Sequence, residues 1–315
     1  MSHPTRSTLE GVPRVQPYQG VGCPEDISFP SCMRACVEFL GDERFGCHDR
    51  LGCRPHSRTT CAYAYFTGVS GAAAFLNWKP GWRLDIVDIR TMTDDPAAPL
   101  QRACAAAGYG CEILSQRGPE DEALFRRRII ESIADEGRPV IAFGVIGPPD
   151  ACLVTGYDEG GDVLIGWNYY QDSSRFSAGV GREPTGEFRK RDWFANTPML
   201  MLLGERQPDR PLGEINRETL CWWVEVMRTP ITQGDRRNGL AAYSAWADAL
   251  LDDSAFPAGD EATLRAHHGA HDMIVGNLAA FRWAGARFLT ELEVPYSLIE
   301  ELWRAGACFL AEHAL

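Results

Sequence analysis

The sequence has few basic side chains for its length. It contains 31 Lys and Arg against 43 Asp and Glu in 315 residues, which gives a formal charge of −12. Nucleic-acid backbones and anionic membrane surfaces attract proteins with a cationic surface. We therefore expect neither nucleic acid nor membrane as a partner.

Long apolar runs are also missing. The most apolar stretches, PVIAFGVIGPP and PMLMLL, are much shorter than the ~20 residues that cross a bilayer. The opening stretch, MSHPTRSTLEGVPRVQPYQG, lacks the apolar segment of a signal peptide. Eleven cysteines without a secretion signal favour reduced thiols. These features predict a globular protein of the cytoplasm.

Two common cofactor signatures do not occur. The sequence has no P-loop and no G-x-G-x-x-G motif, and we expect no cofactor. One polar loop, with Cys47, His48, Cys53, His56 and Cys61, is dense enough in thiols and imidazoles to bind zinc, although it holds no C-x-x-C pair. Scattered reduced cysteines in a loop are the alternative interpretation.

Residue periodicity predicts an α+β fold for the first part of the chain. A change of pattern follows the Pro-rich junction at residues 206–213, after which the apolar spacing is helical and predicts an all-helical bundle. We therefore expect domains at residues 1–208 and 209–315, with four helices in the second. In the first domain a helix is expected at residues 119–137, and strands at residues 111–116, 139–146, 151–158 and 162–170.

Cys32 is the first candidate for chemistry. We expect a helix that begins at Ser31 and ends near Gly41, with Pro30 just before it, so that Cys32 lies in the first turn. A helix N-terminus lowers the pKa of a thiol, and the N–H group of the cysteine can stabilise an oxyanion. The alternative is a buried structural thiol, because cysteine is among the most buried residue types.

Three blocks of sequence carry a resemblance. The blocks are FPSCMRACVEFLG, YFTGVSGAAAFLNW and GRPVIAFGVIGPPDACLVTGYDEGGDVLIGWN. They resemble bacterial papain-like proteins of the butirosin-biosynthesis protein H family, which are related to double-glycine leader peptidases. The resemblance covers roughly residues 20–205 and implies a papain-like fold, a helix packed on an antiparallel sheet. It implies Cys32 as nucleophile and Asn168 as the orienting residue. Asp150 stands where this family has its histidine base, and Asp26 where an oxyanion-hole glutamine is expected.

An aspartate at the base position changes the chemistry. A carboxylate with a pKa of about 3.9 is a poor base for a thiol with a pKa of about 8.5, and its charge raises the pKa of a nearby thiol. Three interpretations stay open: His48 or His56 supplies the base, Asp150 holds a substrate amine, or the site is an inactive scaffold.

The resemblance implies a thiol acyltransferase or amide hydrolase that uses Cys32 on a small or peptidyl substrate. The same resemblance implies an acyl carrier protein as a possible partner. Whether the chain forms a homo-oligomer stays open. The alternative functions are an inactive papain-like scaffold that binds a small polar ligand, and a zinc protein built on the loop at residues 47–61.

Aromatic side chains accompany these segments. An apolar ligand pocket near Cys32 could be lined by Trp78, Trp82, Trp167 and Tyr169. Packing in the core explains each of these residues equally well.

His267 and His271 have the i, i+4 spacing of a metal-binding pair. No H-E-x-x-H frame accompanies them. A solvated helix start is the interpretation that this part of the sequence favours.

Overall fold

The structure is a computed structural model that describes residues 3–17, 25–46, 60–83 and 88–292. The chain forms two compact units, and each combines two separate stretches of sequence. Unit 1 comprises residues 1–63 and 107–208, and unit 2 comprises residues 64–106 and 209–315.

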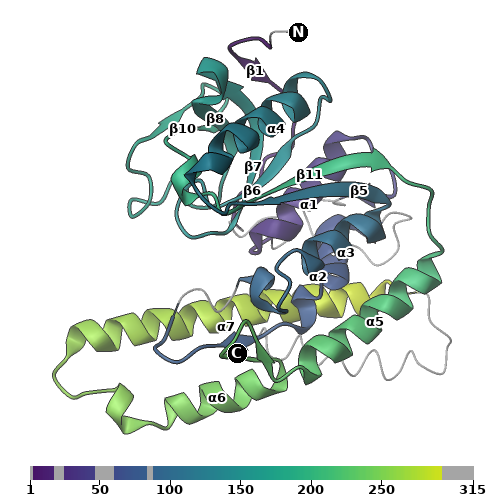
Figure 1. Ribbon diagram of the computed structural model, residues 1–315. Helices are drawn as coiled ribbons and strands as arrows, with labels where there is room; N and C mark the ends of the chain where they lie inside the picture. Colours follow the sequence, from purple (N-terminus) through teal and green to yellow (C-terminus); the bar gives the residue numbers. More distant parts are fainter. Residues whose placement is uncertain (1–2, 18–24, 47–59, 84–87, 293–315) are drawn as a thin grey trace. The chain divides into compact units, whose positions relative to one another are not determined.

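Unit 1 is built around an antiparallel sheet of eight strands (Figure 1). The strand order is β5-β11-β6-β7-β8-β10-β9, and β1 pairs with β7. β6, β7 and β8 are buried almost throughout, which is typical of strands that are covered on both faces. The strands of this sheet are β1 (Ser7–Thr8), β5 (Tyr109–Ser115), β6 (Val140–Phe143), β7 (Ala151–Asp158), β8 (Val163–Trp167), β9 (Val180–Arg182), β10 (Phe188–Arg191) and β11 (Met199–Arg206).

Two helices cover this sheet from opposite sides. The ring of Phe29 in α1 (Ser28–Phe39) lies 6.2 Å from that of Phe143 in β6. The neighbouring Ala142 instead packs in a cluster with Phe125 of α4 (Glu122–Ala134). Successive side chains of a strand point to opposite faces, so α1 and α4 lie on different faces of the sheet. The α+β class that the sequence predicts, with helices on an antiparallel sheet, is confirmed.

Shorter elements complete unit 1. A parallel pair of two-residue strands lies outside the main sheet. Three 3-10 helices connect the longer elements. These segments are β2 (Phe45–Gly46), β3 (Thr60–Cys61), η4 (Pro119–Asp121), η5 (Glu159–Gly161) and η6 (Phe194–Asn196).

Unit 2 is mainly helical. Its two stretches of sequence are tied together by buried contacts: the indole N–H of Trp223 donates to the carbonyl of Gly68 at 2.7 Å, and Arg282 donates to that of Ala73 at 2.7 Å. α6 and α7 contribute side chains to one apolar cluster. The helices are α2 (Ala62–Ser70), η1 (Ala72–Ala74), η3 (Ile89–Thr91), α3 (Ala98–Ala107), α5 (Leu212–Arg228), α6 (Leu240–Leu250), η7 (Asp253–Ala255) and α7 (Glu261–Thr290).

The prediction of an all-helical second domain is wrong. Unit 2 contains a three-stranded sheet, in the order β12 (Ile231–Thr232), β13 (Arg236–Asn238) and β4 (Asn77–Trp78). Asn77 is fully buried there, and its amide donates to Thr232 Oγ1 at 3.3 Å. Strands of two or three residues leave no alternating pattern that a sequence could reveal.

The expected division at residue 208 is one of the boundaries between the two units. Residues 64–106, which we assigned to the first domain, group with unit 2, because α2 and the segment after it pack on α5 and α7. The fourth helix expected near residues 298–309 lies outside the described residues.

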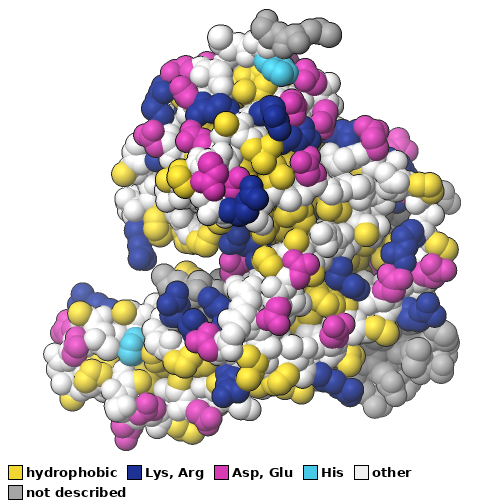
Figure 2. Space-filling view, viewed as in Figure 1, with side chains coloured by type: hydrophobic (Ala, Val, Ile, Leu, Met, Phe, Trp, Pro, Cys, Tyr) yellow, Lys and Arg dark blue, Asp and Glu magenta, His cyan; other side chains and the backbone are white. Residues whose placement is uncertain are grey.

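Two surface properties bear on partners. Of the helices that the structure describes, none combines the length and apolar character needed to cross a membrane. On the face shown in Figure 2, acidic and basic side chains are interspersed.

Candidate functional site

Cys32 lies one turn later in its helix than the sequence predicts. α1 begins at Ser28, so Cys32 is its fifth residue and Pro30 its third. Pro30 is tolerated because the first N–H groups of a helix have no intrahelical acceptor. The prediction that Ser31 caps the helix is wrong, since its hydroxyl donates to the carbonyl of Ile27 at 3.1 Å. By helix geometry the N–H of Cys32 faces the carbonyl of Ser28, and it is not a free oxyanion donor.

The Cys32 side chain is fully buried. No part of it is accessible, and burial raises the pKa of its thiol well above the ordinary value. The neighbouring Cys152, Cys36 and Asp150 raise the pKa of Cys32 further by charge repulsion, whereas Arg34 opposes them. The thiol is therefore held neutral and out of contact with solvent.

Asp150 ends the loop between β6 and β7 and points at the start of α1. Its carboxylate accepts hydrogen bonds from the Ser28 hydroxyl and from the N–H of Ala151, the latter at 3.0 Å. The Ser28 hydroxyl in turn accepts from the same N–H at 3.0 Å. The hydroxyl of Tyr170 is a further hydrogen-bond partner of Asp150, and burial raises the pKa of that tyrosine. Asp150 thus binds α1 to β7 through a set of internal hydrogen bonds.

Asn168 follows β8 and is buried. Its Oδ1 accepts from the N–H of Tyr170 at 2.7 Å, and its Nδ2 lies 3.5 Å from the carbonyl of Gly144. Its side chain also hydrogen-bonds the thiol of Cys152 in β7. Burial raises the pKa of Cys152, and the hydrogen bond from Asn168 only partly offsets this effect.

Tyr169 closes the other side of α1. Its hydroxyl lies 2.7 Å from the hydroxyl of Ser31 and donates to the carbonyl of Glu25. Burial raises the pKa of Tyr169 well above its ordinary value, with further effects from Tyr63, Glu25 and Cys32. The candidate site is therefore a closed polar network around the first two turns of α1.

The loop that carries Asp150 is strained. Val145 has a φ of 63° and is fully buried, which is unusual for a β-branched residue. Gly144 has a φ of 98°, and a Cβ there would lie 1.8 Å from the carbonyl oxygen of Asn196. The N–H of Gly144 donates to the carbonyl of Asp150 at 2.9 Å, which closes the loop. The position of Asp150 is thus set by a tight backbone.

The structure brings Cys32, Asp150 and Asn168 together in unit 1, through Cys152 as a shared neighbour. Asp26, expected at an oxyanion hole, is exposed. The alternative bases His48 and His56 lie outside the described residues, as do Cys47 and Cys53 of the expected zinc loop. Cys61 of that loop is buried in β3. Within the described part of unit 1 the one histidine is His3, which pairs with Asp135 at 2.9 Å.

The four aromatic residues expected to line a pocket are divided between the units. Trp167 and Tyr169 belong to unit 1, and Arg14 lies over the Trp167 ring at 5.0 Å. Trp78 and Trp82 belong to unit 2, where their rings pack edge to face at 5.2 Å. Both are buried in the apolar cluster of unit 2, so packing within their own unit accounts for them.

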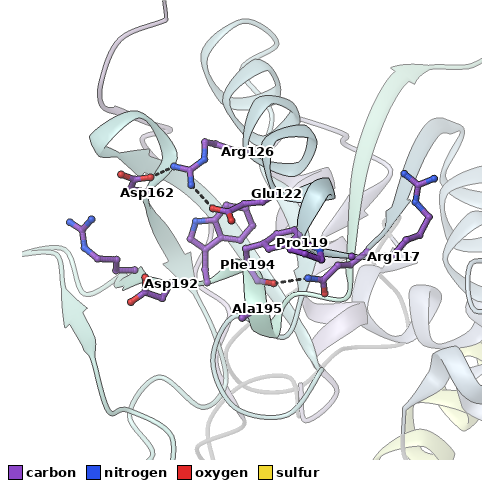
Figure 3. A pocket seen from close by; sticks show the side chains of 12 residues that line it. Arg117, Pro119, Glu122, Arg126, Asp162, Asp192, Phe194 and Ala195 are labelled. Atoms are coloured by element: carbon purple, nitrogen blue, oxygen red, sulfur yellow. Dashed lines mark hydrogen bonds and ion pairs between the residues drawn. The ribbon is translucent and has the colours of Figure 1, made fainter.

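A separate open pocket lies in unit 1 between α4 and the end of β10 (Figure 3). Its volume is about 690 Å³, within the range of small-ligand sites. Arg126 donates to Glu122 at 2.6 Å and to Asp162, so that it bridges two carboxylates at one side of the pocket. The lining residues are Gln116, Arg117, Gly118, Pro119, Glu122, Arg126, Asp162, Arg191, Asp192, Trp193, Phe194 and Ala195.

Sequence reasoning missed several members of the network around Cys32. Ser28 was not distinguishable from other hydroxyl residues, and Cys152 reads as an ordinary member of an apolar strand. The pocket residues also escaped notice because they come from three separate segments of the chain. No group of three or more His, Cys, Asp or Glu side chains in the described residues is placed to hold a metal ion.

Comparison with known proteins gives no relative. No family model, no curated protein and no solved structure matches this chain.

Proposed function

We propose that unit 1 is a papain-like scaffold that binds a small polar ligand and carries out no thiol chemistry. A cysteine-bearing helix packed on an antiparallel sheet, with Asp150 and Asn168 following in order, supports the papain-like part. The complete burial of Cys32 is the observation that carries the non-catalytic part.

A cysteine nucleophile needs a thiolate that can reach the substrate. Burial and the charge of Asp150 both raise the pKa of Cys32, so the thiolate is disfavoured. Asp150 occupies the base position, but it accepts hydrogen bonds from Ser28 and Ala151, and a carboxylate is a weak base for a thiol. The groups that would catalyse acyl transfer act here as a structural network.

The ligand in this proposal occupies the open pocket beside α4. Its walls carry three arginines and three carboxylates, and they suit a small molecule with charges of both signs. Trp193 is among the lining residues, and its indole N–H donates to the carbonyl of Gly161 at 3.0 Å. An amino acid or a similar zwitterion fits this chemistry.

An acylation assay tests the non-catalytic part. The protein is mixed with p-nitrophenyl acetate, and the release of p-nitrophenol is compared between the unaltered chain and Cys32→Ala. We expect identical time courses and no acetyl group on Cys32 by peptide mass spectrometry. A burst that the substitution abolishes would show an acyl-enzyme and would restore the thiol acyltransferase or hydrolase.

The pocket is tested separately with free amino acids as probes. We expect a saturable shift of the Trp193 indole N–H signal in NMR spectra with at least one amino acid, and loss of that shift in Arg126→Gln. Arg265→Gln is the matched control, because that arginine lies in unit 2 and is 82% exposed. If no amino acid shifts Trp193, the pocket does not bind this class of ligand.

We also propose that the protein works in the reducing cytoplasm. Four cysteines of the described residues are free thiols: Cys32, Cys36, Cys152 and Cys221. Three of them are buried in unit 1, and buried thiols suit a compartment in which cysteines stay reduced. The test is a titration of free thiols in the protein as purified from cells, after unfolding. Fewer thiols than the sequence has cysteines would contradict this location.

A further inference from the structure

We propose that His267 and His271 form a two-histidine site for a divalent transition-metal ion in unit 2. Both residues lie on α7, which runs without interruption from Glu261 to Thr290. Residues four apart on a helix have Cβ atoms about 5–6 Å from each other. Two imidazoles at this spacing share one face of the helix and can reach a common ion.

Both imidazole rings are held by aromatic neighbours. His267 stacks on Trp82 with ring centroids 5.3 Å apart and planes at 18°, and Phe256 packs edge-on against it at 6.0 Å. His271 lies 5.4 Å from the ring of Trp246. Most residues at the start of α7 are exposed, as expected of a solvated helix start, but His267 and His271 are half-buried. Rings that packing fixes lose little freedom when they bind an ion.

Three nitrogen atoms in this cluster have no hydrogen-bond partner among the described residues. They are Nδ1 of His267, Nδ1 of His271 and Nε1 of Trp246, and all three are buried. An unsatisfied buried polar group costs about 1–3 kcal/mol, and such groups call for an explanation. The two imidazole nitrogens lie on histidines four residues apart on one helix, so a single bound ion could give both of them a partner.

The surroundings of the pair suit a cation. The charge of Asp260 interacts with His267, and Asp260 also caps α7 by accepting from the N–H of Thr263 at 3.0 Å. Trp82 has a φ of 52°, a strained value for a bulky residue. Backbone strain of this kind concentrates at ligand sites.

The protein supplies two ligands in this proposal. No group of three metal-ligating side chains occurs among the described residues, so water fills the other positions. Imidazole ligands favour Cu²⁺, Ni²⁺ and Zn²⁺ over Mg²⁺ and Ca²⁺. Two ligands without a third lead us to expect moderate affinity and ready exchange.

Titration with Ni²⁺ tests the proposal on the full chain. Binding is measured by calorimetry for the unaltered protein, for His267→Gln and His271→Gln, and for His268→Gln as the matched control. His268 is the exposed neighbour on the same helix. We expect an affinity loss of at least tenfold in the first two variants and no change in the control. Equal affinities in all four proteins would overturn the proposal.

A second measurement needs no variant at the site. Ni²⁺ is paramagnetic, and it broadens NMR signals of nearby hydrogens. We expect selective broadening of the indole N–H signals of Trp82 and Trp246, each assigned by a Trp→Phe substitution. Ni²⁺ that binds the chain and leaves both signals sharp would place the metal elsewhere and refute the site, even if the histidine variants fail to fold.

Discussion

Alkylation of Cys32 in the folded protein should be far slower than that of an exposed cysteine. The comparison is internal, because Cys221 in α5 is exposed and Cys32 is fully buried. Iodoacetamide reacts with the thiolate, so a site must be both ionised and open. A raised pKa and burial both oppose the reaction at Cys32.

The expected slowing of alkylation follows from the free-energy cost of opening the structure around Cys32. The Cys32 sulfur becomes accessible only if α1 separates from the sheet, which also exposes Phe29 and Met33, at 2% and 0% exposure in the structure. Exposing such a side chain costs about 1.5–3 kcal/mol, so opening costs about 3–6 kcal/mol. Since 1.4 kcal/mol is a factor of ten, the opening alone should slow alkylation by about 10²–10⁴.

The assay is a time course of alkylation near pH 8, quenched with acid and followed by peptide mass spectrometry. Each cysteine gives its own rate, and the ratio of Cys221 to Cys32 is the quantity of interest. In denaturant the two rates should converge, which controls for differences in peptide detection. A native rate for Cys32 within tenfold of that for Cys221 would refute the reasoning and point to an accessible nucleophile.

Three further predictions concern stability. Gly144→Ala should lower the free energy of unfolding by about 2–4 kcal/mol in urea denaturation, because the new methyl group meets a backbone oxygen at a positive φ. Glu25→Gln should cost about 3 kcal/mol since it weakens a buried pair with Arg34 at 2.9 Å, whereas Glu25→Leu combined with Arg34→Met should restore most of the loss. The hydrogen bond from Arg189 holds the pKa of Asp158 below its usual value, so this pair stabilises the fold above a pH of about 3.9 and the effect is lost as the pH falls further. Asp158→Asn should flatten the acid limb of a thermal unfolding profile, and an unchanged limb would contradict that role.

Local elements were the most predictable part of the fold. The sequence predicts α4 through the spacing of Phe125, Ile129 and Ile133, which share one face of the helix and are buried. β7 and β8 are mostly apolar and are separated by a glycine-containing turn. Such patterns depend on neighbours in the sequence, so the sequence alone is enough to find them.

The start of α1 was less predictable because the real N-cap, Ile27, offers no side-chain acceptor. Ser31 looked like a cap, yet it lies inside the helix. A helix whose first turn is fixed by Asp150 and Tyr169, far along the chain, carries no local signal of its start.

The nature of the candidate site also depended on distant residues. The order of Cys32, Asp150 and Asn168 along the chain suggested one site, and the structure places them around a common neighbour, Cys152. Whether a thiol in such a site is open or closed depends on the packing of α1 against β7. Cysteine is both a small apolar residue and a nucleophile, so its identity could not decide between the two.

The interleaving of the two units bears on how the chain is made. Residues 64–106 leave the ribosome before residues 209–292, on which they pack, have been translated. At roughly 5–20 residues per second, synthesis of the residues between the two stretches takes about 5–20 seconds, during which the first stretch of unit 2 has apolar surface uncovered. Meanwhile unit 1 can close as soon as β11 emerges. A chain arrested after residue 208 would hold a complete unit 1 and only the first stretch of unit 2, whose apolar surface would stay uncovered.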